Sequence, residues 1–259
     1  MDNTHSFVVK IILSIVLVHC VTLASAAVAK SKLSGKFHIC QPKEKDFQKC
    51  FKSSVEHALS IITKGNREFN IVPLEPLHIP RLHVGEGNGP VGFGLTFDNC
   101  DFHGLGSVTD ITAKADLEKH TFDISLKVPH IIITGKYEID GRILLLPIRG
   151  RGDINMTCDK PTIDWKIQGK PIDKAGVTYL DIQKFKLVHR VPGGSIHLTN
   201  LFDGDEKLGA TMNKFLNENF KDVLGMVMKD FDETMGELMK GLAKRIFDQL
   251  PYNEIFPTA

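Results

Sequence analysis

The stretch VLGMVMKDFDETMGELMKGL, residues 223–242, holds four of the protein's seven methionines and three of its 22 glycines. It belongs to a longer segment without proline, because none stands between Pro192 and Pro251. Apolar residues recur there every three or four positions, which predicts a helix over residues 205–250. Asp203 and Glu206 resemble a capping box at its start.

A helix of this length is unusual for a chain of 259 residues. At about 1.5 Å per residue it would extend roughly 65 Å, so we expect either a break near Gly225, Gly236 or Gly241, or a domain elongated along the helix. One side is apolar and the other carries charges of both signs, which is typical of a helix with one solvated face. We expect Asp230 and Asp232 on that solvated face, away from any apolar cleft.

The preceding residues, 91–201, alternate between apolar and polar positions, which predicts an antiparallel meander. Upstream, a one-sided helix is expected from about residue 47 to residue 62, followed by a proline-rich extended segment at residues 71–84. The long helix needs an apolar partner, and the inner face of the sheet is the candidate. We therefore predict an α+β fold, elongated, in which a strongly curved antiparallel sheet wraps the C-terminal helix.

Methionine and phenylalanine on the buried side of that helix suggest more than packing. Methionine is flexible, and five of seven methionines lie on the helix: Met212, Met226, Met228, Met235 and Met239. An adaptable apolar wall of this kind can leave room for a small apolar guest. Core packing without a cavity is the alternative interpretation of the same pattern.

The N-terminus predicts secretion. Residues 1–26 have a polar start, an apolar core and small residues at Ala24, Ser25 and Ala26, as in a cleaved signal peptide. We expect residues 27–259 to form a single domain of an extracellular protein. Lys and Arg number 32 against 31 Asp and Glu, which gives no basic field for nucleic acid, and no later segment suggests stable membrane insertion.

Four cysteines remain after removal of the signal. We predict a disulfide between Cys40 and Cys50, while pairing of Cys100 with Cys158 stays open. No zinc-type spacing occurs, so no metal or cofactor is expected. Asn155 begins an Asn-Met-Thr acceptor for N-glycosylation.

Signals for catalysis are weak. Ser195 and His197 lie close together, but the second glycine of a Gly-x-Ser-x-Gly turn is missing. We therefore predict a protein that is not an enzyme, and retain a secreted hydrolase using Ser195 as a testable alternative. A signalling or interaction protein with a fully packed interior is a further one.

Several motifs in order along the chain carry a family resemblance. They are the Cys40 and Cys50 spacing, PLEPLHIP at residues 73–80, GKYEIDG at 135–141, LPIRGRG at 146–152, and NLFDG at 200–204 followed by NKFLN at 213–217. Together they resemble the takeout and juvenile-hormone-binding protein family of insects, on its takeout-like branch. The resemblance implies a curved sheet around a long helix with an internal tunnel.

The resemblance also implies a secreted carrier of juvenile-hormone-like terpenoids or fatty acyl lipids, with some members under circadian control or linked to feeding. We expect a monomer whose partner is a small hydrophobic ligand, and the sequence names no receptor. The alternative function is a lipid-transfer or host-defence protein acting at membranes. The candidate ligand-binding residues are Phe51, Val55, Ile62, Ile131, Ile133, Tyr137, Ile143, Leu145, Phe220, Val227, Phe231, Met235 and Leu238.

Overall fold

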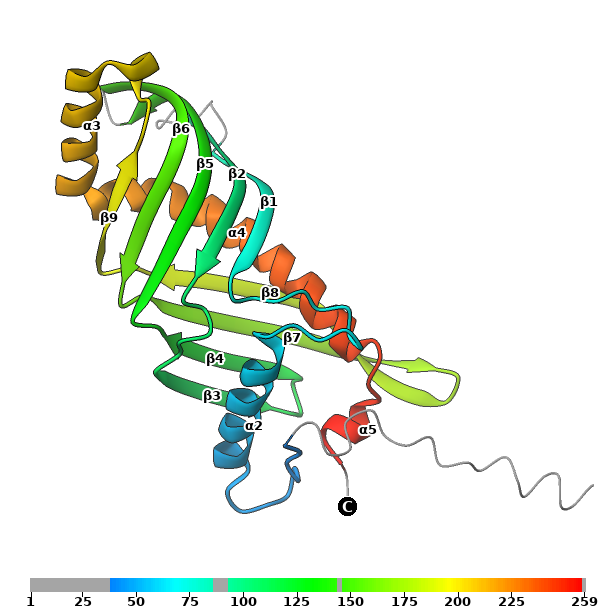
Figure 1. Ribbon diagram of the computed structural model, residues 1–259. Helices are drawn as coiled ribbons and strands as arrows, with labels where there is room; N and C mark the ends of the chain where they lie inside the picture. Colours follow the sequence, from blue (N-terminus) through cyan, green and yellow to red (C-terminus); the bar gives the residue numbers. More distant parts are fainter. Residues whose placement is uncertain (1–37, 86–92, 144–145, 258–259) are drawn as a thin grey trace, which may run out of the picture. The chain divides into compact units, whose positions relative to one another are not determined.

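The computed structural model describes residues 38–85, 93–143 and 146–257, and the predicted signal peptide lies outside these ranges. The elements follow the predicted order of helix, strands and helices (Figure 1). They are α2 (Phe47–Ile62), β1 (Leu77–Val84), β2 (Phe93–His103), β3 (Asp110–Asp116), β4 (Thr121–Lys127), β5 (His130–Ile143), β6 (Leu146–Asp159), β7 (Thr162–Lys174), β8 (Val177–Arg190), β9 (Gly193–Leu198), η1 (Phe202–Gly204), α3 (Glu206–Glu218), α4 (Phe220–Phe247) and α5 (Tyr252–Ile255).

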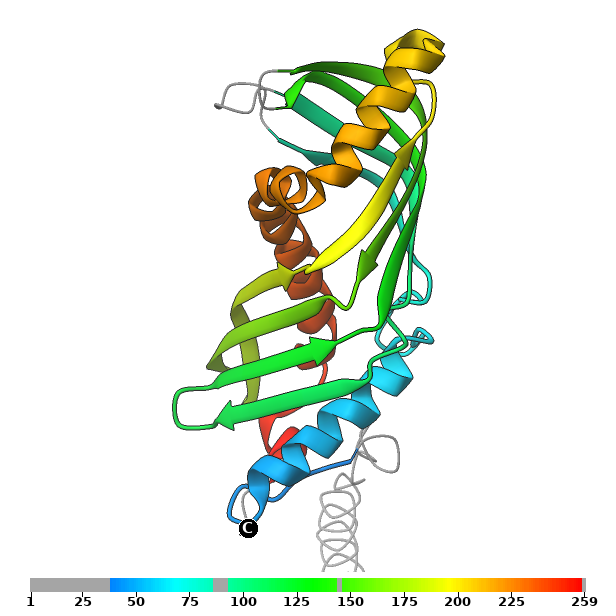
Figure 2. The ribbon, with the colours of Figure 1, turned by 90° about the vertical axis from the view of Figure 1, so that its left-hand side faces the viewer.

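The strands form two antiparallel sheets where a single meander was predicted. One has the order β1-β2-β5-β6-β9 and the other the order β3-β4-β7-β8. The prediction was wrong here because β3 and β4 belong to the other sheet, where β4 pairs with β7. In the five-stranded sheet β2 therefore pairs directly with β5. The predicted α+β class is confirmed: a curved antiparallel sheet covers the long C-terminal helix, and neither sheet closes on itself (Figure 2).

The predicted helix over residues 205–250 is divided at Asn219, and none of the three glycines breaks it. Asn219 leaves helical geometry, with φ −113° and ψ 25°, and its side-chain amide donates to the carbonyl oxygen of Phe215 at 2.9 Å. The capping box was also misplaced. Asp205 caps α3 by accepting from the amides of Lys207 and Leu208, and Asp203 has a left-handed φ of 57°.

Helix α3 is attached to β9, the last strand of the five-stranded sheet. The Asn213 side chain donates to the carbonyl oxygen of Leu198 and accepts from its amide, both at 2.9 Å. Asn217 makes the same pair of bonds to Ile196, at 2.7 and 3.0 Å. Side chains four apart on a helix are spaced like alternate residues of a strand, so the two asparagines satisfy the free edge of β9 as a further strand would. This attachment explains why the chain turns at Asn219 before α4 begins.

Helix α4 lies against β8 at close range, and Gly236 makes this possible. A Cβ atom at Gly236 would be only 2.9 Å from the carbonyl oxygen of Phe185 on β8. Gly225 and Gly241 have no such neighbour within 4 Å, and both are exposed. Close packing against β8 therefore explains the glycine at position 236, but not those at positions 225 and 241.

The first helix within the described residues, α2, packs on the four-stranded sheet. Phe51, Val55 and Leu59 are buried, and the Gln48 amide bridges the backbone of Ala115 on β3. The ring of Phe51 also packs at a tilt against that of Phe122 on β4, with ring centroids 5.9 Å apart. The predicted disulfide between Cys40 and Cys50 is present and ties the segment before α2 to its first turns.

The glycines of α4 give a stability test. We expect Gly236→Ala to lower the free energy of unfolding by about 1–3 kcal/mol, because the added methyl group pushes α4 away from β8. Gly225→Ala and Gly241→Ala are matched controls that should each raise it by about 0.5–1 kcal/mol through helix propensity. Urea unfolding followed by fluorescence of the single tryptophan measures all three. If Gly236→Ala also raised the free energy of unfolding, the result would contradict the close contact between α4 and β8.

Candidate functional site

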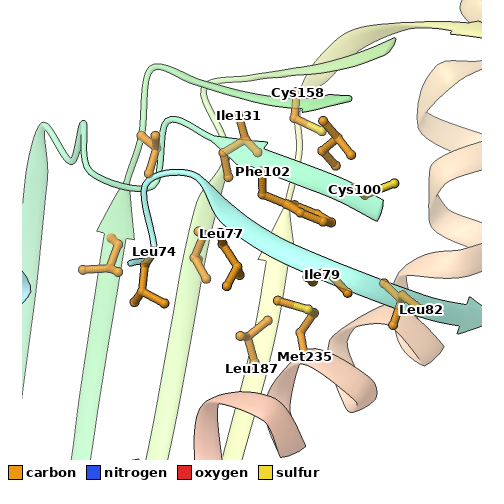
Figure 3. Close-up of a cluster of buried hydrophobic side chains, with 14 of the residues drawn as sticks. Leu74, Leu77, Ile79, Leu82, Cys100, Phe102, Ile131, Cys158, Leu187 and Met235 are labelled. Atoms are coloured by element: carbon orange, nitrogen blue, oxygen red, sulfur yellow. The ribbon is translucent and has the colours of Figure 1, made fainter. Parts of the chain in front are cut away.

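An apolar cavity of about 120 Å³ lies between the five-stranded sheet, strand β8 and helix α4. Figure 3 shows part of the buried cluster around it, with Met235 of α4 near Leu187 of β8 and with Leu77 and Phe102 above. The lining residues are Leu77, Val84, Leu95, Phe97, Phe102, Leu105, Ile131, Ile133, Ile139, Ile143, Ile154, Met156, Cys158, Pro161, His189, Val191, Ile196, Leu198, Leu216, Phe220, Val223, Leu224, Val227, Met228, Phe231 and Met235.

The strand part of this wall follows from alternation. On β6, Ile154, Met156 and Cys158 are buried and line the cavity, while Asn155 between them is exposed. On β9, Ile196 lines the cavity and its neighbours Ser195 and His197 face outward. The cavity therefore has apolar walls because each strand directs alternate side chains inward.

Seven of the candidate ligand-binding residues line the cavity: Ile131, Ile133, Ile143, Phe220, Val227, Phe231 and Met235. Leu145 lies outside the described residues. Of the methionines on the helices, Met228 and Met235 line the cavity, whereas Met226 and Met239 pack against the surrounding core.

The other five candidates lie elsewhere. Phe51, Val55 and Ile62 are on α2, which packs on the four-stranded sheet and does not line this cavity. Leu238 is 40% exposed, because it falls on the outer flank of α4. The apolar spacing of both helices was visible in the sequence, but it does not say which sheet a helix packs against.

Tyr137 was expected to offer a polar group to a ligand. Instead its hydroxyl donates to the carbonyl oxygen of Thr199 at 2.6 Å, and Tyr137 is not among the lining residues. Burial raises the pKa of this phenol to about 12. Tyr137 therefore fixes β5 to the segment after β9.

His189 contributes a polar ring to the cavity wall. Its partner is Asp232, whose position differs from the prediction. The Asp232 carboxylate lies 2.6 Å from Nδ1 of His189, and the two side chains are only 14% and 11% exposed. Asp232 was expected to face solvent, whereas it faces β8. Met228 and Met235 are four and three residues away from Asp232, so its spacing is compatible with the buried side of α4, but spacing does not reveal a partner for the carboxylate.

Cys100 and Cys158 are both buried and free, which answers the question of their pairing. They lie on β2 and β6, separated by β5. Burial raises the pKa of Cys158, in the cavity wall, to about 12, and the pKa of Cys100 to about 11. Both are therefore protonated thiols at neutral pH.

The described ranges give little support for a metal site, a catalytic pair or a membrane-spanning helix. They bring together one trio of possible metal ligands, His38, Cys40 and Cys50, and two of these atoms are the disulfide sulfurs. Ser195 and His197 share the outer face of β9, away from the cavity. Among the described residues, no helix has both the length and the apolar character needed to cross a membrane.

Comparison with known proteins gives a consistent result. The family model "Haemolymph juvenile hormone binding protein (JHBP)" matches residues 15–257. "Circadian clock-controlled protein daywake" of Drosophila yakuba is 23% identical over 81% of this chain and 84% of its own length. "Putative beta-carotene-binding protein" of Schistocerca gregaria is 23% identical over 82% and 84%.

Among solved structures, Takeout 1 of Epiphyas postvittana superimposes with a TM-score of 0.69 at 24% identity. The superposition covers 85% of this chain and 100% of the Takeout 1 chain. At this identity the likeness establishes the fold, a sheet around a helix with an apolar interior.

The two buried thiols provide a test of how closed the cavity wall is. At about pH 8 we expect both to react with iodoacetamide far more slowly than in urea, because burial restricts access to both thiols and raises their pKa, and thiolate is the reactive form. The rate should rise about tenfold per pH unit. Mass spectrometry of the wild type and of Cys158→Ala assigns each product. Equal rates in folded and unfolded protein would contradict a closed wall.

Proposed function

Because the chain belongs to the haemolymph juvenile hormone binding protein family, we propose that it is a secreted, non-enzymatic carrier of a small hydrophobic ligand held in the cavity between α4 and the five-stranded sheet. The observation that carries this proposal is the wall itself. Its side chains come from six strands, two helices and three connecting segments, and nearly all of them are apolar. Such a wall binds by removing ligand surface from water, at about 0.8 kcal/mol per buried CH₂ group.

The size of the cavity bears on the ligand. About 120 Å³ is the scale of a void that holds a single aromatic ring, whereas drug-sized ligands occupy about 300–1,000 Å³. A terpenoid or a fatty acyl lipid therefore requires side chains to move aside. Met156, Met228 and Met235 can do so at low cost, because methionine has three rotatable side-chain bonds and no branch. We propose these two ligand classes because family membership implies them and because the methionines allow the cavity to enlarge.

Secretion is part of the proposal and has two supports. Residues 1–26 read as a signal peptide, and the disulfide between Cys40 and Cys50 fits an oxidising compartment. Asn155 is exposed on β6, so a glycan there would meet no packed surface. A link to daily rhythms is supported by the name of the fly relatives, and transcript sampling through a day tests it. A link to feeding is supported only by the family resemblance.

Native mass spectrometry of the protein secreted from insect cells tests the carrier role. We expect a stoichiometric apolar adduct that solvent extraction removes, and displacement of an apolar fluorescent probe by terpenoids or fatty acyl lipids. Met235→Trp and Phe231→Trp fill the cavity and should weaken binding at least about tenfold. Leu238→Trp is the matched control on the same helix, because that residue is 40% exposed and does not line the cavity.

Two results would contradict the carrier role. One is an interior without ligand, together with no displacement of the probe by any apolar compound. The other is equal weakening by Leu238→Trp and Met235→Trp, which would place the binding site elsewhere. Ligand exchange only with vesicles would instead favour the lipid-transfer alternative, and ester turnover lost in Ser195→Ala would favour a hydrolase.

A further inference from the structure

His189 and Asp232 form a closed hydrogen-bonded pair at the edge of the cavity. Nδ1 of His189 lies 2.6 Å from Oδ1 of Asp232, and the backbone amide of His189 donates to the same carboxylate at 3.2 and 3.3 Å. The ring of His189 packs 5.4 Å from that of Phe231, which is itself 6.2 Å from Phe102. The imidazole is thus fixed between β8 and α4 by contacts on both sides.

The pair determines which ring nitrogen is left for a ligand. An ionised carboxylate only accepts hydrogen bonds, so the tautomer of a neutral imidazole that fits this contact has its proton on Nδ1 and a lone pair on Nε2. Nε2 has no hydrogen-bond partner among the described residues, and His189 lines the cavity. Apart from His189, the lining side chain that can donate a hydrogen bond is the Cys158 thiol, a weak donor, and the methionine sulfurs are only weak acceptors.

We propose that Nε2 of His189 accepts a hydrogen bond from a ligand hydroxyl group, so that the protein prefers long apolar alcohols. This inference rests on the proposed carrier function and names its ligand class. A ligand without an O–H group that covers Nε2 leaves this atom without a hydrogen bond, which weakens binding. An ionised fatty acid brings a second carboxylate close to Asp232, and like charges in an apolar site repel.

A structural role alone is the competing explanation, because the pair also joins α4 to β8. The chain offers a matched control for this role: Lys244 of α4 pairs with Asp181 of β8. Neither residue lines the cavity. Loss of either pair should lower the stability of the helix–strand contact, but only loss of the His189 pair should change ligand preference.

The experiment measures affinities for matched fourteen-carbon ligands by displacement of N-phenyl-1-naphthylamine at about pH 8. The ligands are tetradecanol, methyl tetradecanoate, tetradecane and tetradecanoate. In the wild type the ratio of Kd for the methyl ester to Kd for the alcohol should exceed that of the double variant His189→Leu/Asp232→Leu by about three- to tenfold. The double variant Asp181→Leu/Lys244→Leu should keep the wild-type ratio.

Asp232→Asn is a second test that keeps the ring in place if the double variant does not fold. Removing the negative charge should improve the affinity for tetradecanoate relative to tetradecanol by about three- to tenfold. An unchanged ratio in both His189 and Asp232 variants would overturn the inference while leaving the carrier role intact. Absence of binding for all four ligands and for terpenoids would overturn the carrier role itself.

Discussion

Burial of the apolar side of α4 is the constraint on which the rest of the structure depends. Over 28 residues this helix presents apolar side chains at spacings of three and four, and no short loop could cover them. The five-stranded sheet and β8 supply the covering surface (Figures 1 and 2). The curvature of the sheet, the close helix–strand contact at Gly236 and the position of the cavity all follow from that requirement.

Helix α3 solves a second problem with polar groups. A sheet that wraps a helix without closing leaves an edge strand with free backbone groups, which is a risk for aggregation. Asn213 and Asn217 bind four of these groups on β9. The same arrangement holds α3 at the edge of the sheet while α4 crosses its inner face, so the long apolar segment has to bend between them. The bend at Asn219 thus follows from where the two halves pack.

The cavity wall shows how far pattern alone could locate the site. Ile131 and Ile133 were placed correctly on the inner face because alternation fixes the face of a strand once one side is buried. Phe231 and Met235 also line the cavity, and Leu238, three residues further on, does not. A helix turns its side chains through 100° per residue, so the flank of an apolar stripe can face solvent even when its centre is buried.

The sequence by itself determined the types of the elements, their order, the disulfide and the α+β class, because periodicity, turn residues and cysteine spacing are local signals. The tertiary structure alone decided which sheet covers which helix, why Gly236 has to be glycine, and that Asp232 faces His189 inside the protein. These features depend on what lies opposite a residue in space, and the partner of Asp232 is 43 positions away along the chain. A charged side chain is expected to face solvent as long as the surface opposite it in the fold is unknown.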